Sequence, residues 1–222
     1  MSARWQGRVI FADRYAVFEG QTGDNRLHSH AAAQVVIGNN CCVQLGDGTQ
    51  FCGSALLIRP HVRHRLVPQA DLKVILIEPV SDLGEALLTG LSDRAVVILN
   101  DGGRQVEALC TARLAHSLDQ RLVDATTLLS RSSRNDLTLA EVAAAVGLSP
   151  VRLRSIAARQ LGMPLARWRR WASLRRACVA ITEGAAPADA AFAGGFSDQA
   201  HLTRTMRSML GITPASLHRA LS

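Results

Sequence analysis

The sequence predicts a two-domain α+β protein in which a β-rich N-terminal part is followed by helices. Short apolar or alternating runs separated by Gly and Asn fill the first 80 residues, which is typical of a small β-barrel or sandwich. From about residue 81, apolar side chains recur at helical spacing instead. Helix start and stop signals are dense after residue 136, which indicates an all-α C-terminal domain.

Four apolar runs predict strands in the N-terminal part, at residues 35–37, 42–45, 55–58 and 74–77. Turns are expected at 38–40 and 46–48, where Gly and Asn or Asp cluster. Helices are expected at 83–91 and 106–129. We therefore predict a β-rich domain at 1–80, a helical connector at 81–130, a polar linker at 131–136 and a helical domain at 137–222.

Helix caps divide the last of these regions. Thr138 and Glu141 have the spacing of a capping box, and Ser149 precedes a proline at the first helical position. Helices are expected at about 150–161 and 165–183. Another is expected to start at a Ser197 cap and end near residue 210, and a last one opens at Thr213.

The charge is unevenly distributed. The 222 residues include 25 Lys and Arg and 18 Asp and Glu, for a net charge of +7, and Lys73 is the only lysine. Residues 1–100 carry 9 basic and 9 acidic side chains, whereas residues 101–222 carry 16 and 9. This asymmetry predicts a separate domain with a polyanionic partner, and arginine favours bidentate contacts to phosphate or guanine.

Several classes of protein are excluded. With 48% hydrophobic and 19% charged residues, the chain is not disordered. No apolar run approaches the roughly 18 residues that span a bilayer, and the N-terminus shows no apolar secretion segment. We expect a cytoplasmic protein with no membrane partner, and free thiols at its five cysteines, which are Cys41, Cys42, Cys52, Cys110 and Cys178.

The basic half contains an internal repeat. Shifting the chain by 48 residues places 142–149 on 190–197, and each copy consists of a short Ala-rich helix, a glycine, an apolar residue, a serine and a second helix. This is the helix-turn-helix pattern, and Gly147 and Gly195 suit the positive φ of its turn. Inward positions are predicted for six residues, which are Leu153, Ile156, Leu161, Leu202, Met206 and Leu210.

Residues 137–219 resemble the DNA-binding domain of AraC/XylS-type transcription regulators. The most specific stretch, at 195–214, reads GFSDQAHLTRTMRSMLGITP and is similar to the family signature GFSDQSHFSRxFKRxFGxTP. The resemblance implies that two helix-turn-helix units enter successive major grooves of double-stranded DNA, and that RNA polymerase is a partner if the protein is an activator. It also implies a cupin-like sensor domain at 1–80, and helices at 81–130 that either form a homodimer contact or cover the barrel. It departs at Ser173, where the family usually has Arg, at Arg169, where it has Leu, and at Ile156 and Met206, where it has Phe.

The resemblance also implies DNA-binding residues by position. The first reading helix would use Val151, Arg152, Arg154 and Ser155. The second would use Gln199, Ala200, His201, Thr203 and Arg204. Phosphate contacts would come from Arg159, Arg207 and Arg170.

Four N-terminal residues form a candidate effector pocket: His28, His30, Gln34 and His64. They resemble the cupin pattern of a small barrel, although Gln34 stands where that pattern has Glu. Three interpretations are open. The pocket hydrogen-bonds a small-molecule effector, or His28, His30 and His64 hold a divalent metal with a thiol from Cys42 or Cys52, or the histidines have no function.

A DNA-binding transcription regulator that senses a small effector is therefore the predicted function. A metal- or thiol-responsive regulator of the same type, using Cys41, Cys42 and Cys52, is the alternative. A metal-dependent cupin oxygenase or isomerase is a third hypothesis, which the missing Glu and the repeated helix pairs oppose. We expect that the protein is not an enzyme.

Overall fold

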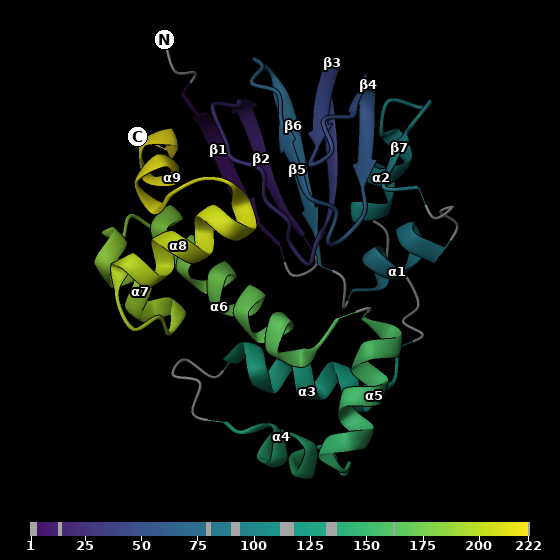
Figure 1. The fold of residues 1–222 in the computed structure, drawn as a ribbon, viewed down its shortest axis with the longest axis vertical. Coiled ribbons are helices and arrows are strands. Elements are labelled where there is room, and N and C mark those ends of the chain that lie inside the picture. The colour runs from purple at the N-terminus through teal and green to yellow at the C-terminus, as the bar shows by residue number, and fades with distance from the viewer. Residues whose placement is uncertain are drawn as a thin grey trace. The chain divides into compact units, whose positions relative to one another are not determined.

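The computed structural model describes residues 4–12, 15–78, 81–89, 94–111, 118–131, 137–161 and 163–221. Two compact units are present: Met1–Ala115 with Thr203–Ser222, and His116–Leu202. The first contains the sheet and the second is helical (Figure 1). The predicted α+β class is confirmed, whereas the exact domain boundaries stay a prediction.

The first unit is built on one antiparallel sheet. Its strands are β1 (Gln6–Phe11), β2 (Tyr15–Gln21), β3 (Ala33–Leu45), β4 (Gln50–Ile58), β5 (His64–Leu66), β6 (Leu72–Ile77) and β7 (Val96–Ile98). The strand order is β1-β2-β6-β3-β4-β7, and β5 pairs with β3. Among the described residues the sheet stays open rather than closing into the expected barrel, because β1 pairs only with β2 and the three-residue β7 only with β4.

One predicted turn is part of a strand. Residues 38–40 lie inside β3, where the register with β4 shifts between Ile37 and Cys41. Such a bulge adds unpaired residues without reversing the chain, so two predicted strands are one. The turn at 46–48 is confirmed as the β3–β4 hairpin, with Gly48 at φ 91°.

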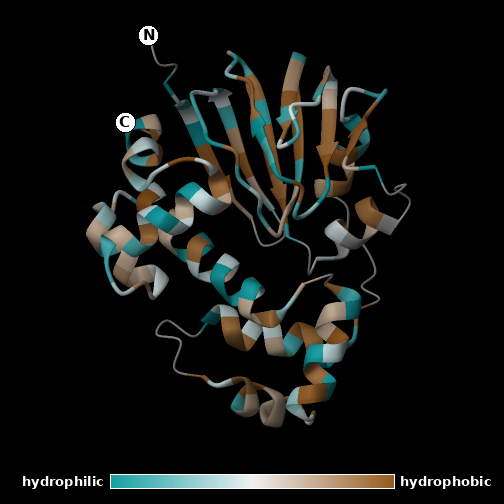
Figure 2. Ribbon diagram, viewed as in Figure 1, coloured by the Kyte–Doolittle hydropathy of each residue, from teal (hydrophilic) through white to brown (hydrophobic). Residues whose placement is uncertain are grey.

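Alternate residues of the sheet face two hydrophobic cores. Val35, Leu57 and Ile75 belong to a core that includes Leu83 of α1 (Asp82–Thr89) and Val106 of α2 (Arg104–Thr111). The neighbouring residues, among them Val36, Leu56 and Val74, form the other core. Figure 2 shows the resulting brown stretches along the strands.

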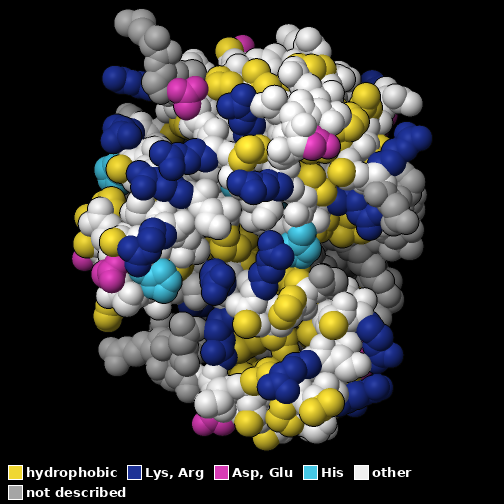
Figure 3. All heavy atoms as spheres, in the orientation of Figure 1, with side chains coloured by type: hydrophobic (Ala, Val, Ile, Leu, Met, Phe, Trp, Pro, Cys, Tyr) yellow, Lys and Arg dark blue, Asp and Glu magenta, His cyan; other side chains and the backbone are white. Residues whose placement is uncertain are grey.

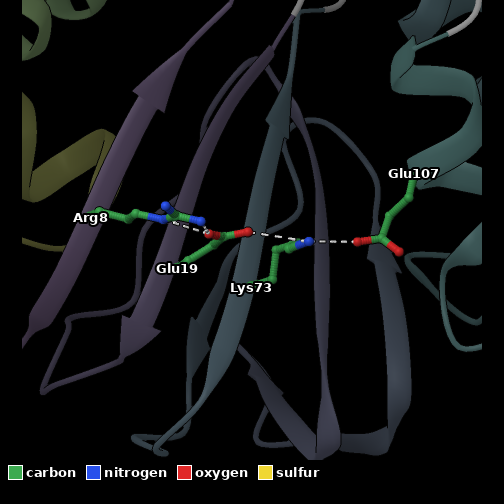
Figure 4. Close-up of polar contacts among 4 residues, drawn as sticks. All are labelled: Arg8, Glu19, Lys73 and Glu107. Atoms are coloured by element: carbon green, nitrogen blue, oxygen red, sulfur yellow. Dashed lines mark hydrogen bonds and ion pairs between the residues drawn. The ribbon is translucent and has the colours of Figure 1, made fainter.

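A row of charged side chains ties β1, β2, β6 and α2 together (Figure 4). Arg8 and Lys73 lie directly opposite Glu19 on its two neighbouring strands. The Arg8 Nε–H donates to Glu19 Oε2 at 2.7 Å, and Lys73 Nζ lies 3.2 Å from Glu19 Oε1 and 2.6 Å from Glu107 Oε1. Arg8 and then Lys73 lower the pKa of Glu19, and Glu107 raises the pKa of Lys73. The single lysine thus joins the sheet to α2.

The expectation of five free thiols is wrong for one pair. Cys42 and Cys52 form a disulfide, while Cys41, Cys110 and Cys178 are free and buried. Cys42 and Cys52 are direct partners in the β3–β4 register, with Cα atoms 4.2 Å apart. The pairing of β3 with β4 brings the two sulfurs together. The separation of ten residues in the sequence does not by itself indicate this pairing.

The helical unit begins with α3 (Gln120–Arg131), α4 (Leu139–Ala145), α5 (Pro150–Gln160), α6 (Leu165–Thr182) and α7 (Pro187–Gly194). α8 (Gln199–Leu210) starts in this unit, and α9 (Pro214–Leu221) belongs to the first. The helix expected at 106–129 is two helices, α2 and α3, with residues 112–117 outside the described part. The predicted linker also lies outside it, except for Arg131. No helix in the described part of the chain is both long and apolar enough to cross a membrane.

Candidate nucleic-acid interface and histidine cluster

Local sequence signals set the ends of the helices in both helix-turn-helix units. Thr138 Oγ1 accepts from the Glu141 amide, and the Glu141 carboxylate accepts from the Thr138 amide, so the predicted capping box is confirmed. Ser149 Oγ accepts from the amide of Arg152, as expected. The turns have Gly147 at φ 67° and Gly195 at φ 78°, a backbone conformation that favours glycine.

The cap of the second reading helix differs from the prediction. The amide of His201 donates to Asp198 Oδ1 at 2.6 Å, so Asp198 caps α8 in place of Ser197. Aspartate is as good an N-cap as serine, and the signal was present in the sequence. Ser197 Oγ instead lies 3.2 Å from His201 Nδ1, and the ring of Phe196 packs edge-on against the His201 imidazole. These contacts orient one of the predicted reading residues.

The long helix α6 joins the two motifs through buried contacts. Trp168, Trp171 and Leu174 are buried along it. Arg176 Nη1 donates to the Ser130 carbonyl at 2.6 Å, and Nη2 donates to the Gly194 carbonyl at 3.0 Å and to Ser173 Oγ at 3.1 Å. Sequence reasoning missed this arginine, which fastens α6 to α3 and to the end of α7.

Two residues that depart from the family signature, Ser173 and Arg169, make hydrogen bonds of their own in the structure. Ser173 accepts the hydrogen bond from Arg176, and Arg169 Nη2 donates to the Leu137 carbonyl. Ile156 and Met206, in place of Phe, are buried as a core residue must be. The smaller side chains therefore keep the packing role.

The predicted reading residues lie on the outer side of α5 and α8. Val151 is 72% exposed, although it is apolar. The other exposed members are Arg152, Arg154, Ser155, Arg159, Gln199, Ala200, Arg204 and Arg207, while His201 and Thr203 are half-buried. The predicted inward residues are buried, except for Leu210, which is only half-buried. Its neighbour Met209, which was not predicted to face inward, is buried instead. A helix with one buried face leaves the opposite face for a partner.

A hollow of about 780 Å³ lies between the two reading helices. Arg154 of α5 and His201 of α8 both line it, and Arg169 and Arg170 of α6 contribute from between them. In the lower part of Figure 3, basic side chains border an apolar surface on this unit. One concave surface is thus bordered by the reading residues of both motifs and by cationic groups.

The three predicted histidines converge in the sheet unit. His28 and His64 exchange backbone hydrogen bonds of 2.9 Å, which brings residues distant in sequence together. His28, His30 and His64 are buried, and their ligand atoms lie within 4.8 Å of one another. Gln34 Oε1 is 2.8 Å from His30 Nε2 and 3.2 Å from His64 Nε2. The structure therefore brings together all four residues of the candidate pocket.

Backbone carbonyls set the tautomers of these imidazoles. The Nδ1 atoms of His28, His30 and His64 lie 2.8, 2.8 and 2.9 Å from the carbonyl oxygens of residues 26, 32 and 62. A carbonyl can only accept, so each Nδ1 carries a proton, and in the neutral ring Nε2 is then the acceptor. Burial, followed by the charges of neighbouring imidazoles, holds the pKa of His28 well below its usual value and lowers that of His64 to about 4.

The cluster has the donor chemistry of a divalent metal site. Three imidazole rings and the Gln34 amide face one another, and Gln34 is the hydrogen-bond partner of His30 and His64. Imidazole suits borderline ions such as Zn²⁺, Co²⁺ and Ni²⁺, and a second hydrogen bond from the ligand ring to a carbonyl is typical of metal-bound histidine. Cys42 and Cys52 do not belong to the cluster, since they are bonded to each other. Cys41 is buried, which raises its pKa and makes it a poor sensor thiol.

Two helix-turn-helix units with outward arginines define a DNA-binding protein. A family profile described as "Helix-turn-helix domain" matches residues 142–220. A ligand-free variant of ToxT from Vibrio cholerae is similar in structure, with a TM-score of 0.63 and 11% identity over 95% of this chain and 99% of that one. ToxT bound to an unsaturated fatty acid has a TM-score of 0.61 and 10% identity over 95% and 97%. A search of curated protein sequences finds no significant match.

At these identities the structural likeness shows the fold, with a sheet-rich N-terminal region and a helical C-terminal region. Residues 142–220 are a helix-turn-helix domain. The protein is a DNA-binding regulator.

Proposed function

We propose that this regulator reads a specific DNA sequence with the outward residues of α5 and α8, under control of the histidine cluster. The observation that carries the proposal is the hollow between the two reading helices. Because Arg154 of α5 and His201 of α8 border the same hollow, both motifs open onto one surface, and a duplex lying across that surface meets both. The DNA backbone between the two grooves then lies over Arg170, which is exposed.

The test is selection of bound sequences from random duplex DNA by the full chain. We expect an enriched site with two half-motifs about one helical turn apart, and an affinity that falls steeply with salt because arginines displace counterions from phosphate. Arg204→Ala should cost about 1–3 kcal/mol and relax the preference at one base pair. Arg207→Ala should weaken all sequences alike, and Arg65→Ala, an exposed change on β5, should leave binding unchanged. A selection that enriches no sequence would contradict the proposal.

We further propose that the effector at His28, His30 and His64 is a divalent metal ion, with Gln34 as the adjoining oxygen donor. The three buried, converging imidazoles support a metal ion more than an anionic organic effector. The arginines nearest in sequence, Arg63 and Arg65, are exposed, and Arg65 Nε–H donates to Gln44 at 2.7 Å. ToxT shows that this fold is compatible with a bound fatty acid, so a small organic effector is the alternative.

Elemental analysis of untagged protein decides between these two effectors. A metal content near one per chain, lost in His30→Gln, supports the metal. A content near zero that does not rise on adding Zn²⁺, Co²⁺ or Ni²⁺ refutes it and leaves the organic effector. We assign no catalytic step to the cluster. A homodimer through residues 81–130 and a contact with RNA polymerase stay predictions.

A further inference from the structure

The segment that carries two of the three histidines also holds the turn between α8 and α9. The Arg26 amide donates to the Gly211 carbonyl at 3.0 Å, and the Ser29 amide donates to the Ser208 carbonyl at 3.3 Å. All four residues lie in one compact unit. The far end of the second reading helix is thus bonded to the backbone on both sides of His28.

Gly211 is in direct contact with the bond that orients His28. A Cβ on this glycine would lie 2.6 Å from the Arg26 carbonyl oxygen and 2.6 Å from His28 Nδ1. These are the two atoms joined by the 2.8 Å hydrogen bond that sets the tautomer of His28. With φ at 72°, Gly211 lets the turn approach this bond more closely than any side chain would allow.

We propose that metal binding at the histidine cluster and docking of the α8–α9 turn onto residues 26–29 are energetically coupled, so that each strengthens the other. This inference rests on the metal site proposed above. A cation on His28 Nε2 makes the Nδ1–H a stronger donor to the Arg26 carbonyl. It also holds residues 26–29 in the conformation that presents both backbone amides to the turn. Coupling between two binding events is reciprocal, so a change in the turn must alter metal affinity.

Two glycine substitutions form a matched pair for the test. Gly211→Ala introduces a clash with residues 26 and 28, whereas Gly48→Ala, at φ 91°, meets nothing within 4 Å. Both changes impose a backbone conformation that alanine rarely adopts, so only the contact differs. The full chain is titrated with Co²⁺, followed by its visible absorption, with Zn²⁺ as competitor.

We expect Gly211→Ala to weaken Co²⁺ binding by about 5-fold or more, within the usual range of coupling, and Gly48→Ala to change it less than about 2-fold. Equal affinity of the two variants would overturn the coupling while leaving the metal site standing. Failure of the unaltered chain to bind Co²⁺ or Zn²⁺ would overturn both. The DNA selection above tests the reading helices independently of either result.

Hydrogen exchange of the unaltered chain gives a second readout that requires no change at Gly211. Peptides covering α9 (Pro214–Leu221) are remote in sequence from every metal ligand. Zn²⁺ should slow their exchange several-fold in the unaltered chain and have no effect in His30→Gln. If Zn²⁺ binds and exchange in α9 is unchanged, the two events are independent and the proposal is wrong.

Discussion

Arg176→Ala is expected to destabilise the helical unit by about 2–4 kcal/mol. The guanidinium makes three hydrogen bonds, to the carbonyls of Ser130 and Gly194 and to Ser173 Oγ. A hydrogen bond to a charged group contributes about 1.5–3 kcal/mol, but burial opposes the charge and lowers the pKa of Arg176. The net loss is therefore smaller than the sum of the three bonds.

The assay is urea unfolding of the full chain followed by tryptophan fluorescence, because Trp168 and Trp171 both lie buried on α6. Arg176→Lys should fall between the unaltered chain and Arg176→Ala, since one ammonium cannot reproduce the planar fork. Arg170→Ala, an exposed neighbour, should leave stability within about 0.5 kcal/mol while weakening DNA binding. If Arg176→Ala unfolds at the same urea concentration as Arg170→Ala, the three bonds do not hold the helices together.

Three more outcomes are expected. Alkylation of the denatured chain should label three cysteines without reductant and five with it, whereas five in both cases would rule out the disulfide. Thr138→Ala should cost about 1 kcal/mol in thermal unfolding through loss of the capping box, and Thr138→Ser should retain most of the stability; equal stability of the two variants would contradict the cap. Lys73→Met should speed hydrogen exchange in α2, because the bond to Glu107 is lost, and exchange rates equal to those of the unaltered chain would show that the ion pair does not hold the helix.

The local features of the helical part follow from sequence. The capping box at Thr138, the proline after Ser149 and the positive φ at Gly147 and Gly195 depend on neighbouring residues only, and each is present in the structure. The cap of α8 was predicted one position too early, at Ser197, whereas Asp198 caps the helix. Both residue types are good N-caps, so the sequence alone did not distinguish them.

The sheet was harder to predict because its register depends on partners far along the chain. The bulge between Ile37 and Cys41 makes one strand of two apparent ones. It also determines that Cys42 faces Cys52, which local spacing does not show. Strand spacing and the cupin resemblance predicted a barrel, but closure depends on the pairing of the end strands, and among the described residues β1 and β7 do not pair with each other.

By itself the sequence determined the class of protein, since a repeat of 48 residues and a specific signature place two helix-turn-helix units in the basic half. It also named the four residues of the histidine cluster. Only the tertiary structure decided that these residues converge, that their Nδ1 atoms face carbonyls, and that Gly211 lies against His28. The physical reason is the separation in sequence of the residues that interact. Periodicity and helix caps depend on residues a few positions apart, whereas the histidine cluster depends on strand pairing and on a turn at Gly211, more than 180 positions from His28.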